Sequence, residues 1–478
     1  MTGWPLLPTL VLTAGALGLL LVEAFRRPGS AAGMAWGALG ITALTLGVVA
    51  ALAGRGEVEG LYRMVHWDPK AFWLSLTILI GTGLAILLSR HYLADRGIER
   101  GEYYVFLLLA AAGMLLMAVA ADLLIIFLAL EWLSFPLYVL AGFARPQLES
   151  EEAALKYFLL GAFASAFLVF GIALIFAGTG LTNLRDLAAW WKRPDPGAQP
   201  LVWIGGAMLL VALGFKVAAV PFHLWTPDVY EGAPTPVTGF MAAATKTAAV
   251  AALIRVFLVG LGPAVALWSG PVALMAAATM LVGNGVALMQ SNFKRMMAYS
   301  SIAHAGYLLM GLLGDPGLAV PGVMFYLLAY TLATMGAFAV AVGMVGPEGE
   351  DQSFRAYAGV ARRSPGMGTA MALFMLSLIG VPPTAGFFAK LLLFAAAWQA
   401  GWIALVIVGV VTTVISAYFY LRVVVAMWMG PEEPACLPRP YPWVRLSVSL
   451  AGVGTPMRDS MKRAIAVPIP GDLRATPA

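Results

Sequence analysis

Long apolar segments, separated by short polar ones, follow one another along almost the whole chain. Most are long enough, at about 16 to 30 residues, to cross roughly 30 Å of hydrocarbon as helices. The pattern predicts an all-α polytopic membrane protein, and a retained first helix because its arginines follow it. The expected spans are Leu6–Val22, Ala31–Leu52, Phe72–Leu88, Tyr104–Ala120, Leu123–Phe143, Leu155–Ala177, Leu201–Val220 with its continuation beyond Pro221, Val237–Val259, Val265–Met289, Ala298–Leu313, Gly317–Val345, Gly368–Phe394 and Trp402–Met429.

Two of these spans are interrupted by proline. Pro221 follows an apolar segment that contains Lys216, and Lys246 lies in the next segment. Pro382–Pro383 interrupt the span that contains Lys390. Proline lacks a backbone donor and clashes with the preceding turn, and hydrocarbon tolerates such a break only against protein or a water-filled cavity. Paired breaks point to an internally repeated transporter, with a hinge or packing kink as the alternative.

Composition places the chain in a membrane and excludes several kinds of site. Hydrophobic residues make up 61% and charged residues 11%, whereas soluble domains carry about 25% charged residues. The single cysteine, Cys436, excludes four-cysteine iron–sulfur ligation and an internal disulfide framework. No glycine-rich nucleotide motif occurs, and the net charge of +5 is interpreted as loop topology rather than nucleic-acid binding.

The loop charges predict an orientation. Basic loops remain preferentially in the cytoplasm, and more basic residues follow odd-numbered spans than even-numbered ones. The N-terminus is therefore expected outside. The odd-numbered loops contain Arg26, Arg27, Arg90, Arg96, Arg100, Arg145, Lys294, Arg295, Arg355, Arg362 and Arg363, and the even-numbered loops contain chiefly Arg55, Arg63, Lys70, Arg185, Lys192 and Arg193.

Several ionisable residues lie inside apolar spans, where a charge costs about 2.5–3.5 kcal/mol by insertion scales. Glu131 is near the middle of its span, and a buried carboxylate either becomes protonated or finds a cation such as Lys216 or Lys246. A lysine whose carboxylate partner can move away is a switchable proton site. A static ion pair that fixes helix register is the alternative, for Lys246 and Lys390 as well.

His304 lies about two turns into its span, counting 3.6 residues per turn, among serines and tyrosines. A neutral imidazole can pass a proton between lysines, although most lone histidines on apolar faces are satisfied core residues. Arg255 and Arg422 are expected to be helix-end anchors, and His223 and Asp228 to cap backbone at the first break. The candidate proton-transfer residues are Glu131, Lys216, Lys246, His304, Lys390, Lys294 and Lys156, the last two with placement at the membrane interface as the alternative.

Three segments carry a close resemblance to a known family: PFHLWTPDVYEGAPTPVTGF, LEWLSFPLYVLAGF and QSNFKRMMAYSSIAHAGY. From the first helix to about Met429, the chain resembles the N-type antiporter-like membrane subunits of respiratory complex I, the subunit N family of NADH-quinone oxidoreductases. The resemblance implies fourteen helices, including two inverted five-helix repeats that each contain one broken helix. It implies three N-terminal helices in 1–100 and repeats in 101–262 and 263–430.

The resemblance also implies a function. It implies a subunit of a proton-pumping NADH:quinone oxidoreductase in the bacterial inner membrane, with the other membrane subunits, including further antiporter-like ones, as partners. It implies that this chain holds no flavin, iron–sulfur cluster or quinone site, and that partner subunits hold these groups. The implied polar axis places a Glu131–Lys216 pair at one end, then Lys246, Lys294 and His304, and Lys390 at the other, with Lys156 beside it.

Residues 431–478 depart from the family pattern. They contain nine prolines, and their only apolar run, Trp443–Gly454, is too short for a span of roughly 20 residues. The sequence therefore predicts a proline-rich tail that does not cross the membrane, either a genuine extension or the result of a changed reading frame near Gly454. Two other function classes stay open: a subunit of a multi-subunit cation/proton antiporter without redox activity, and a structural membrane spacer.

Overall fold

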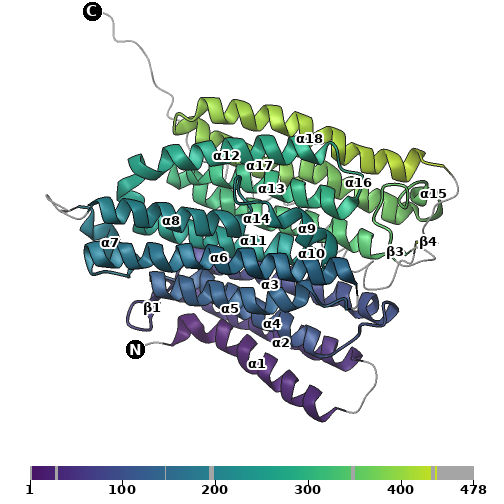
Figure 1. Cartoon of the computed structure of the whole chain (residues 1–478), viewed down its shortest axis with the longest axis horizontal. Coiled ribbons are helices and arrows are strands. Elements are labelled where there is room, and N and C mark those ends of the chain that lie inside the picture. Colours follow the sequence, from purple (N-terminus) through teal and green to yellow (C-terminus); the bar gives the residue numbers. More distant parts are fainter. Residues whose placement is uncertain are drawn as a thin grey trace, which may run out of the picture.

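The computed structural model describes residues 3–26, 31–145, 147–192, 199–345, 350–431 and 437–438. Within these residues the chain forms a bundle of roughly parallel helices, with the connecting loops gathered at its two ends (Figure 1). Eleven of the helices are long and apolar enough to cross a membrane. The predicted all-α, multi-span architecture is therefore confirmed.

The N-terminal part forms an edge of the bundle. A small antiparallel hairpin, in which Glu59 is opposite His66, connects its second and third long helices. Its elements are η1 (Trp4–Leu6), α1 (Leu7–Phe25), α2 (Ala32–Leu52), η2 (Ala53–Arg55), β1 (Val58–Gly60), β2 (Val65–Trp67) and α3 (Pro69–Asp95).

The middle of the chain contains the first broken helix and one composite helix. The two halves of the broken helix are α8 and α9, and the composite helix runs from Thr235 to Gly260 with two π-helical turns. The elements are α4 (Glu102–Val119), α5 (Leu123–Ala141), α6 (Leu148–Thr179), α7 (Leu184–Trp190), α8 (Gln199–Val217), α9 (Trp225–Gly232), α10 (Thr235–Phe240), η3 (Met241–Thr245), α11 (Lys246–Leu253) and η4 (Ile254–Gly260).

The last part contains the second broken helix, whose halves are α16 and α17. Its short strand β3 pairs antiparallel with β4. The elements are η5 (Gly262–Ala264), α12 (Val265–Ala287), α13 (Phe293–Leu312), α14 (Pro316–Val342), β3 (Met344–Val345), α15 (Val360–Arg363), α16 (Pro365–Ile379), α17 (Ala385–Gln399), α18 (Ile403–Met429) and β4 (Leu437–Pro438).

The α3, α13 and α6 helices begin earlier than the hydropathy pattern predicts, the first two because capping residues rather than apolar residues set their starts. Asp68 accepts a hydrogen bond from the Ala71 amide at 2.8 Å and starts α3. Asn292 accepts one from the Arg295 amide at 3.1 Å and starts α13, so Lys294 and Arg295 lie in its first turn. The third helix, α6, extends to Leu148 and includes an acidic first turn.

Both broken helices part at the prolines. The α8 helix ends at Val217, a short irregular segment with the cis Val220–Pro221 bond follows, and α9 begins at Trp225. In the second break, α16 ends at Ile379 and is capped by Gly380, whose φ of +89° lies in the left-handed region that favours glycine. The chain then passes the cis Pro382–Pro383 bond and resumes as α17.

A repeated backbone bridge supports the internal repeat. Two pairs of hydrogen bonds have the same pattern, and each residue of the second pair lies 170 positions after its counterpart in the first. The bridges lie at opposite ends of the bundle, near α7 and near α15 (Figure 1), as an inverted repeat requires. The bonds are Leu123 N to Thr182 O and Leu184 N to Ala121 O in the first bridge, and Phe293 N to Gln352 O and Phe354 N to Ser291 O in the second.

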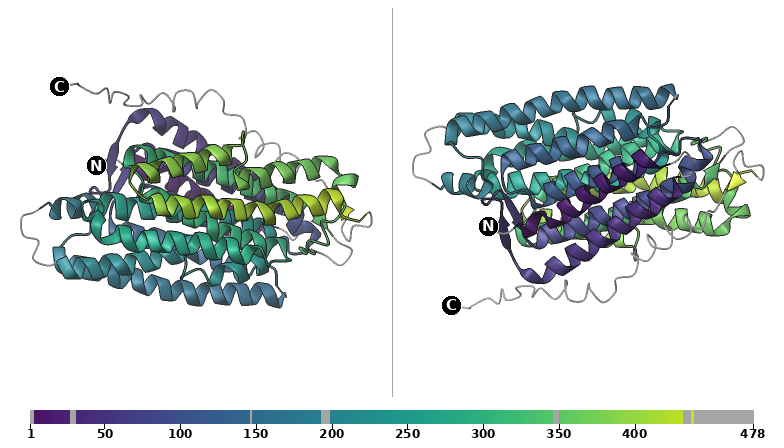
Figure 2. Two further views of the ribbon diagram at one scale, coloured as in Figure 1. Left: turned by 90° about the horizontal axis from the view of Figure 1, so that it is seen from above. Right: turned by 90° about the horizontal axis from the view of Figure 1, so that it is seen from below.

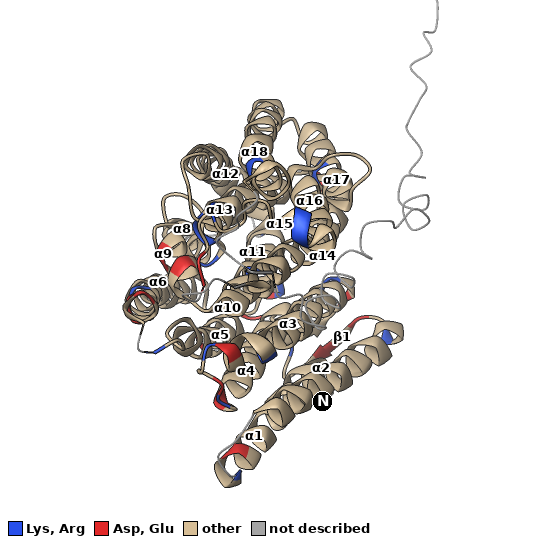
Figure 3. Ribbon diagram, turned by 90° about the vertical axis from the view of Figure 1, so that its right-hand side faces the viewer, with Lys and Arg blue, Asp and Glu red and all other residues tan. Residues whose placement is uncertain are grey.

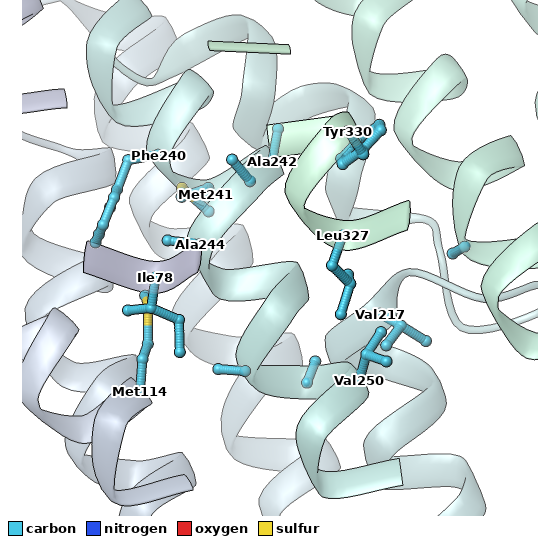
Figure 4. Packing of buried hydrophobic residues seen from close by; sticks show 14 of the residues in the cluster. Ile78, Met114, Val217, Phe240, Met241, Ala242, Ala244, Val250, Leu327 and Tyr330 are labelled. Carbon is cyan, nitrogen blue, oxygen red and sulfur yellow. The ribbon is translucent and has the colours of Figure 1, made fainter. Parts of the chain in front are cut away.

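The composite helix Thr235–Gly260 occupies the centre of the bundle. Views from above and below show α18 on one outer face and α1 with α2 on the opposite one (Figure 2). Between these faces, Met241 and Ala244 of the first π-helical turn pack among side chains of several helices, including Ile78 of α3 and Met114 of α4 (Figure 4). Because it is enclosed on nearly all sides, this helix contacts both halves of the molecule.

Arg255 lies near one end of the composite helix, as the sequence suggests, and anchors it through a buried ion pair. It lies on η4 inside the composite helix, is 3% exposed, and forms hydrogen bonds of 2.8 and 2.9 Å to Asp68. A further bond of 2.9 Å reaches the Ala118 carbonyl. Burial opposes ionisation of Asp68, but hydrogen bonding to His66 and the charges of Arg255 and Lys70 hold its pKa below the ordinary value. The pair ties the start of α3 to the central helix.

The predicted tail lies largely outside the described residues. Only 431 and 437–438 of the segment 431–478 are described, so the absence of a span at Trp443–Gly454 stays a prediction. The same holds for the fourteenth helix that the family resemblance implies. The thirteen predicted spans correspond to helices of the described part, with the two broken spans each built from two helices.

The two ends of the bundle should lie on opposite sides of the membrane. Figure 3 shows the end predicted to face the cytoplasm, with α15 and its arginines toward the viewer. In a background in which Cys436→Ser removes the native thiol, we expect Tyr62→Cys, 75% exposed at the other end, to react with a membrane-impermeant maleimide added to intact cells. Arg100→Cys should react only after lysis. The reverse labelling pattern would show that the orientation is opposite to the predicted one.

The Asp68–Arg255 pair yields a stability prediction. Asp68→Asn should destabilise the protein by about 3–5 kcal/mol, because it leaves a buried guanidinium without its counter-ion. Asp186→Asn is the control, since its pair with Arg63 has a 41% exposed carboxylate and should contribute about 0–1 kcal/mol. The measurement is the thermal midpoint of the purified assembled complex. Equal midpoints for the two variants would show that the buried pair is dispensable.

Candidate functional site

The structure brings most of the predicted site residues into the interior of the bundle. Five are no more than 5% exposed: Lys216, Lys246, Lys294, His304 and Lys390. Glu131 is half-buried, and Lys156 has a 39% exposed side chain. The predicted residues lie on six helices: Glu131 on α5, Lys156 on α6, Lys216 on α8, Lys246 on α11, Lys294 and His304 on α13, and Lys390 on α17.

Lys216 lies in the last turn of α8 and donates a hydrogen bond to the Ser134 hydroxyl at 2.6 Å. Ser134 follows Glu131 by three residues on α5, so both side chains lie on one face of that helix. Glu131 itself accepts a hydrogen bond from Ser165 of α6. Within the described residues no ion pair of 4.0 Å or less joins Glu131 to Lys216. The expected direct pair is therefore open, with a hydroxyl in the place of the carboxylate.

Two tyrosine rings complete the surroundings of Lys216. Its Nζ lies 5.2 Å from the ring centroid of Tyr157 and 5.8 Å from that of Tyr138, within the range of cation–π attraction. Tyr157 in turn stacks on Trp225, the first residue of α9, at 4.7 Å. The ammonium thus has a polar acceptor on one side and aromatic faces on the other, which is a partly compensated cation in an apolar setting.

Lys246 directly follows the π-helical turn Met241–Thr245, and its Nζ donates to the main-chain carbonyl of Ser301 on α13. The π-helix is rare and often occurs at functional sites, since its extra residue displaces the side chains that follow. A cavity of about 10 Å³ lies between α8 and the composite helix, lined by Lys216 and Thr245 among apolar groups. That volume is close to the minimum for one water molecule. The cavity lies between the surroundings of Lys216 and those of Lys246.

His304 is held by hydroxyl groups at both ring nitrogens. Nδ1 is 2.6 Å from the Tyr326 hydroxyl on α14, and Nε2 is 3.0 Å from the Tyr420 hydroxyl on α18. Tyr420 also shares a hydrogen bond with Ser300 of α13. His304 follows Ser301, whose carbonyl binds Lys246, by three residues on the same helix. The histidine therefore connects the Lys246 contact to two tyrosine hydroxyls.

Lys390 completes the row at the second break. Its Nζ donates to the Ile379 carbonyl at 2.9 Å, and Ile379 is the last residue of α16. It also lies 4.7 Å from the ring centroid of Tyr307. A second cavity of about 10 Å³ is lined by Lys390, His304 and hydroxyl-bearing residues of α14 and α16. The break leaves a helix-end carbonyl free, and the C-terminal partial charge of α16 favours a cation there.

The remaining two predicted residues lie away from this row. Lys294 is buried at the end that contains α15 and donates to the Ala233 carbonyl at 2.6 Å. Lys156 lies on the surface and contacts Glu152 and Asp228, each at 2.6 Å. Asp228 therefore forms ion pairs, with Lys156 and with Arg295, and the expectation that it caps backbone is wrong. Half-exposed charges of this kind contribute little individually, and here they hold α9 to α6 and α13.

Sequence analysis missed the tyrosines of His304 and one carboxylate. Tyr326 and Tyr420 lie on distant helices, and their only sequence signal is a tyrosine inside an apolar span. Glu350 lies in a polar loop with no such signal. It accepts hydrogen bonds from Arg96 at 2.5 Å, from Tyr92 at 2.6 Å, and from Thr235. Burial opposes its ionisation, but Lys294, Arg96 and these hydrogen bonds hold the pKa of Glu350 below its ordinary value.

Comparison with known proteins identifies the family of the chain. Residues 120–416 match the family described as NADH:quinone oxidoreductase/Mrp antiporter, transmembrane. The chain is 44% identical to "NADH-quinone oxidoreductase subunit N" of Trichlorobacter lovleyi, covering 90% of this chain and 88% of that protein. It is also 44% identical to the protein of the same name from Chloroflexus aggregans, with 94% and 93% covered.

Solved structures agree with the relatives. A chain of respiratory complex I from Thermus thermophilus is 39% identical and superposes with a TM-score of 0.81, covering 93% of this chain and 95% of that one. A chain of the Mrp complex from Dietzia superposes with a TM-score of 0.79 at 24% identity, covering 91% and 81%, and shares the fold. On these grounds the chain belongs to the subunit N family of NADH-quinone oxidoreductases.

Proposed function

We propose that this chain conducts protons across the bacterial inner membrane as a subunit of a proton-pumping NADH:quinone oxidoreductase. The proton path runs through Glu131, Lys216, Lys246, His304 and Lys390. The other membrane subunits of the complex, including further antiporter-like ones, are its partners. Flavin, iron–sulfur clusters and quinone are held by partner subunits, so the energy of electron transfer reaches this chain laterally.

One observation carries the proposal: the three buried lysines of the path all contact neutral acceptors. Lys216 binds the Ser134 hydroxyl, and the other two bind main-chain carbonyls, of Ser301 for Lys246 and of Ile379 for Lys390. A static ion pair would place a carboxylate in contact with each ammonium and would resist loss of the proton. Neutral acceptors stabilise the charged form less. These contacts therefore favour switchable proton sites over fixed structural pairs.

The path has a group available at each step. Movement of Glu131 toward Lys216 raises the proton affinity of the lysine, and movement away lowers it. The Thr245 hydroxyl and the small cavity beside it lie between Lys216 and the Lys246 region. A neutral imidazole at His304 accepts a proton at one ring nitrogen and releases one at the other. Lys390 then lies where the second helix break leaves free backbone groups.

The half-helices make the two ends of the path alike. Lys216 lies in the last turn of α8, and Lys390 contacts the last residue of α16, so each lysine is near the C-terminus of the first half of a broken helix. The partial negative charge there stabilises a cation in both places. This correspondence supports repeat boundaries at 101–262 and 263–430. Residues 1–100 then form the three-helix N-terminal part.

The alternative functions have less support. The antiporter without redox activity would fit the fold, but the Mrp likeness at 24% identity concerns the fold alone, and the curated relatives are named subunit N. If the chain were only a structural spacer, the buried lysines would be dispensable. Whether proton pumping depends on a buried lysine can be measured at Lys216.

Two substitutions of Lys216 test the proposal. Lys216→Ala should lower proton translocation by about a hundredfold or more while the complex still assembles, because it removes a proton-transfer group. Lys216→Arg should also impair turnover, since a guanidinium keeps its charge and cannot release a proton. The measurement is proton uptake and NADH-driven electron transfer in sealed vesicles that contain equal amounts of assembled complex.

Lys192→Ala is the matched control, because this lysine is exposed at one end of the bundle and lies outside the row. It should pump at the unsubstituted rate. Rescue by arginine, with alanine lowering only assembly, would return Lys216 to a structural role. Full activity of both Lys216 variants would remove it from the mechanism.

A further inference from the structure

The loop of residues 350–354 joins parts of the molecule that are distant in sequence. Its backbone forms the second bridge, in which the Phe293 amide donates to the Gln352 carbonyl at 2.7 Å at the start of α13. Its first residue, Glu350, reaches in the other direction and binds Arg96 and Tyr92 near the C-terminus of α3. One short loop thus holds α13 of the second half against α3 of the N-terminal part.

Glu350 also holds the first turn of the helix that carries Lys246. It accepts a hydrogen bond from the hydroxyl of Thr235, the first residue of α10. The composite helix then continues without interruption to Lys246. Lys294, also from α13, binds the Ala233 carbonyl two residues before this turn. The start of α10 is therefore fixed to α13 both through Glu350 and through Lys294.

The surroundings of Glu350 explain why a carboxylate is required. The cations that face it are Arg96 from α3, at 2.5 Å, and Lys294 from α13. Hydrogen-bond donors come from Tyr92 on α3, Thr235 on α10 and Gln352 in the loop itself. The other acid in the neighbourhood of Lys294 is Glu231 of α9, which is paired with Arg295. Glu350 is thus the carboxylate that pairs with the partly buried Arg96 and faces the buried Lys294.

The repeat offers an internal comparison. The first bridge has the same backbone geometry, and the position 170 residues before Glu350 is occupied by Gly180. Gly180 ends α6 with a φ of +70° and has no side chain to reach another helix. The first bridge therefore has no carboxylate at the position of Glu350, and its own carboxylate, Asp122, accepts a hydrogen bond from Thr182 within the bridge at 2.8 Å. Glu350 is an addition to one of the two bridges, at the one that adjoins the Lys246 helix.

We propose that Glu350 is a positioning residue of the proton path. The contacts of Glu350 and its loop hold α3, α10 and α13 together, and these contacts are called the clasp. The clasp sets the axial position of Lys246 against the Ser301 carbonyl of α13. The Lys246–Ser301 contact joins exactly those elements whose ends the clasp holds, since Ser301 and Lys294 both lie on α13. Loss of the clasp shifts the start of α10 relative to α13 and weakens that contact. Because the pumping effect rests on the proposed function, the test includes a second measurement.

The test is Glu350→Gln in the fully assembled complex. The amide keeps the size of the side chain and removes the charge that pairs with Arg96 and faces Lys294. We expect proton translocation per assembled complex to fall between about twofold and thirtyfold, the usual range for a residue that acts through a network. Amide hydrogen exchange of residues 233–240 and 350–354 should become faster, while exchange in α1 and α18 stays unchanged. Glu350→Asp keeps the charge, so its pumping rate and its exchange rate should lie between those of the unsubstituted protein and those of Glu350→Gln.

Asp351→Asn is the matched control. Asp351 is the adjacent acid, and its described hydrogen bonds, of 2.8 and 3.0 Å, go to Ser353 in the same loop. It should leave both pumping and exchange at 233–240 unchanged. Thr235→Val removes one contact of Glu350 and keeps the charge, so it should produce a smaller effect in the same direction. It provides the test if Glu350→Gln fails to assemble.

A double substitution separates positioning from a general defect. If Glu350 acts through Lys246, Glu350→Gln should add no further loss of pumping in a Lys246→Ala background, whereas independent effects would multiply. Unchanged exchange at 233–240 in Glu350→Gln overturns the clasp, as does a loss of assembly with normal turnover of the complex that remains. Faster exchange with normal pumping of both Glu350→Gln and Lys246→Ala would instead retain the clasp and refute the proton path at Lys246.

Discussion

A charged group inside a membrane protein needs an acceptor from the protein itself, and this constraint explains how the helices are arranged. Regular helices already use their interior carbonyls for backbone hydrogen bonds, so an ammonium binds a side chain, a helix end or the second lone pair of a carbonyl. Lys216 lies in the last turn of α8 and binds the Ser134 hydroxyl, and Lys390, on α17, binds the Ile379 carbonyl at the C-terminal end of α16. The two helix breaks are thus part of the lysine sites and do not merely bend the chain.

The central helix Thr235–Gly260 meets the same constraint differently. It has no proline break at Lys246, and the lysine instead takes a carbonyl of α13. The position of the helix therefore has to be set by contacts at its ends. Arg255 is bound to Asp68 near one end, and Thr235 is bound to Glu350 at the other. Buried charges with good partners are used here to fix where a helix lies, a role they fill in some proteins at a cost in desolvation.

The row from Glu131 to Lys390 crosses the bundle and does not follow any one helix. Its members come from five helices, and the hydrogen bonds of its lysines and its histidine are made with hydroxyl groups and main-chain carbonyls. Such groups can donate and accept, or accept from more than one direction, without a change in helix packing. In the structure the Glu131–Lys216 end is open, with Ser165 and Ser134 taking the two hydrogen bonds. Serines on both sides stabilise the separated pair.

The sequence by itself determined the spans, the two helix breaks and the identities of the buried lysines and of His304. Those features depend on local properties: apolar length, the missing donor of proline, and the cost of a charge in hydrocarbon. Tertiary structure alone decided which acceptor each lysine binds. Ser301 lies 55 residues from Lys246, and Tyr326 and Tyr420 lie 22 and 116 residues from His304, on separate helices. The role of Glu350 could not be predicted for the same reason, because its partners are on α3, α10 and α13 and only the tertiary structure brings these helices to the loop.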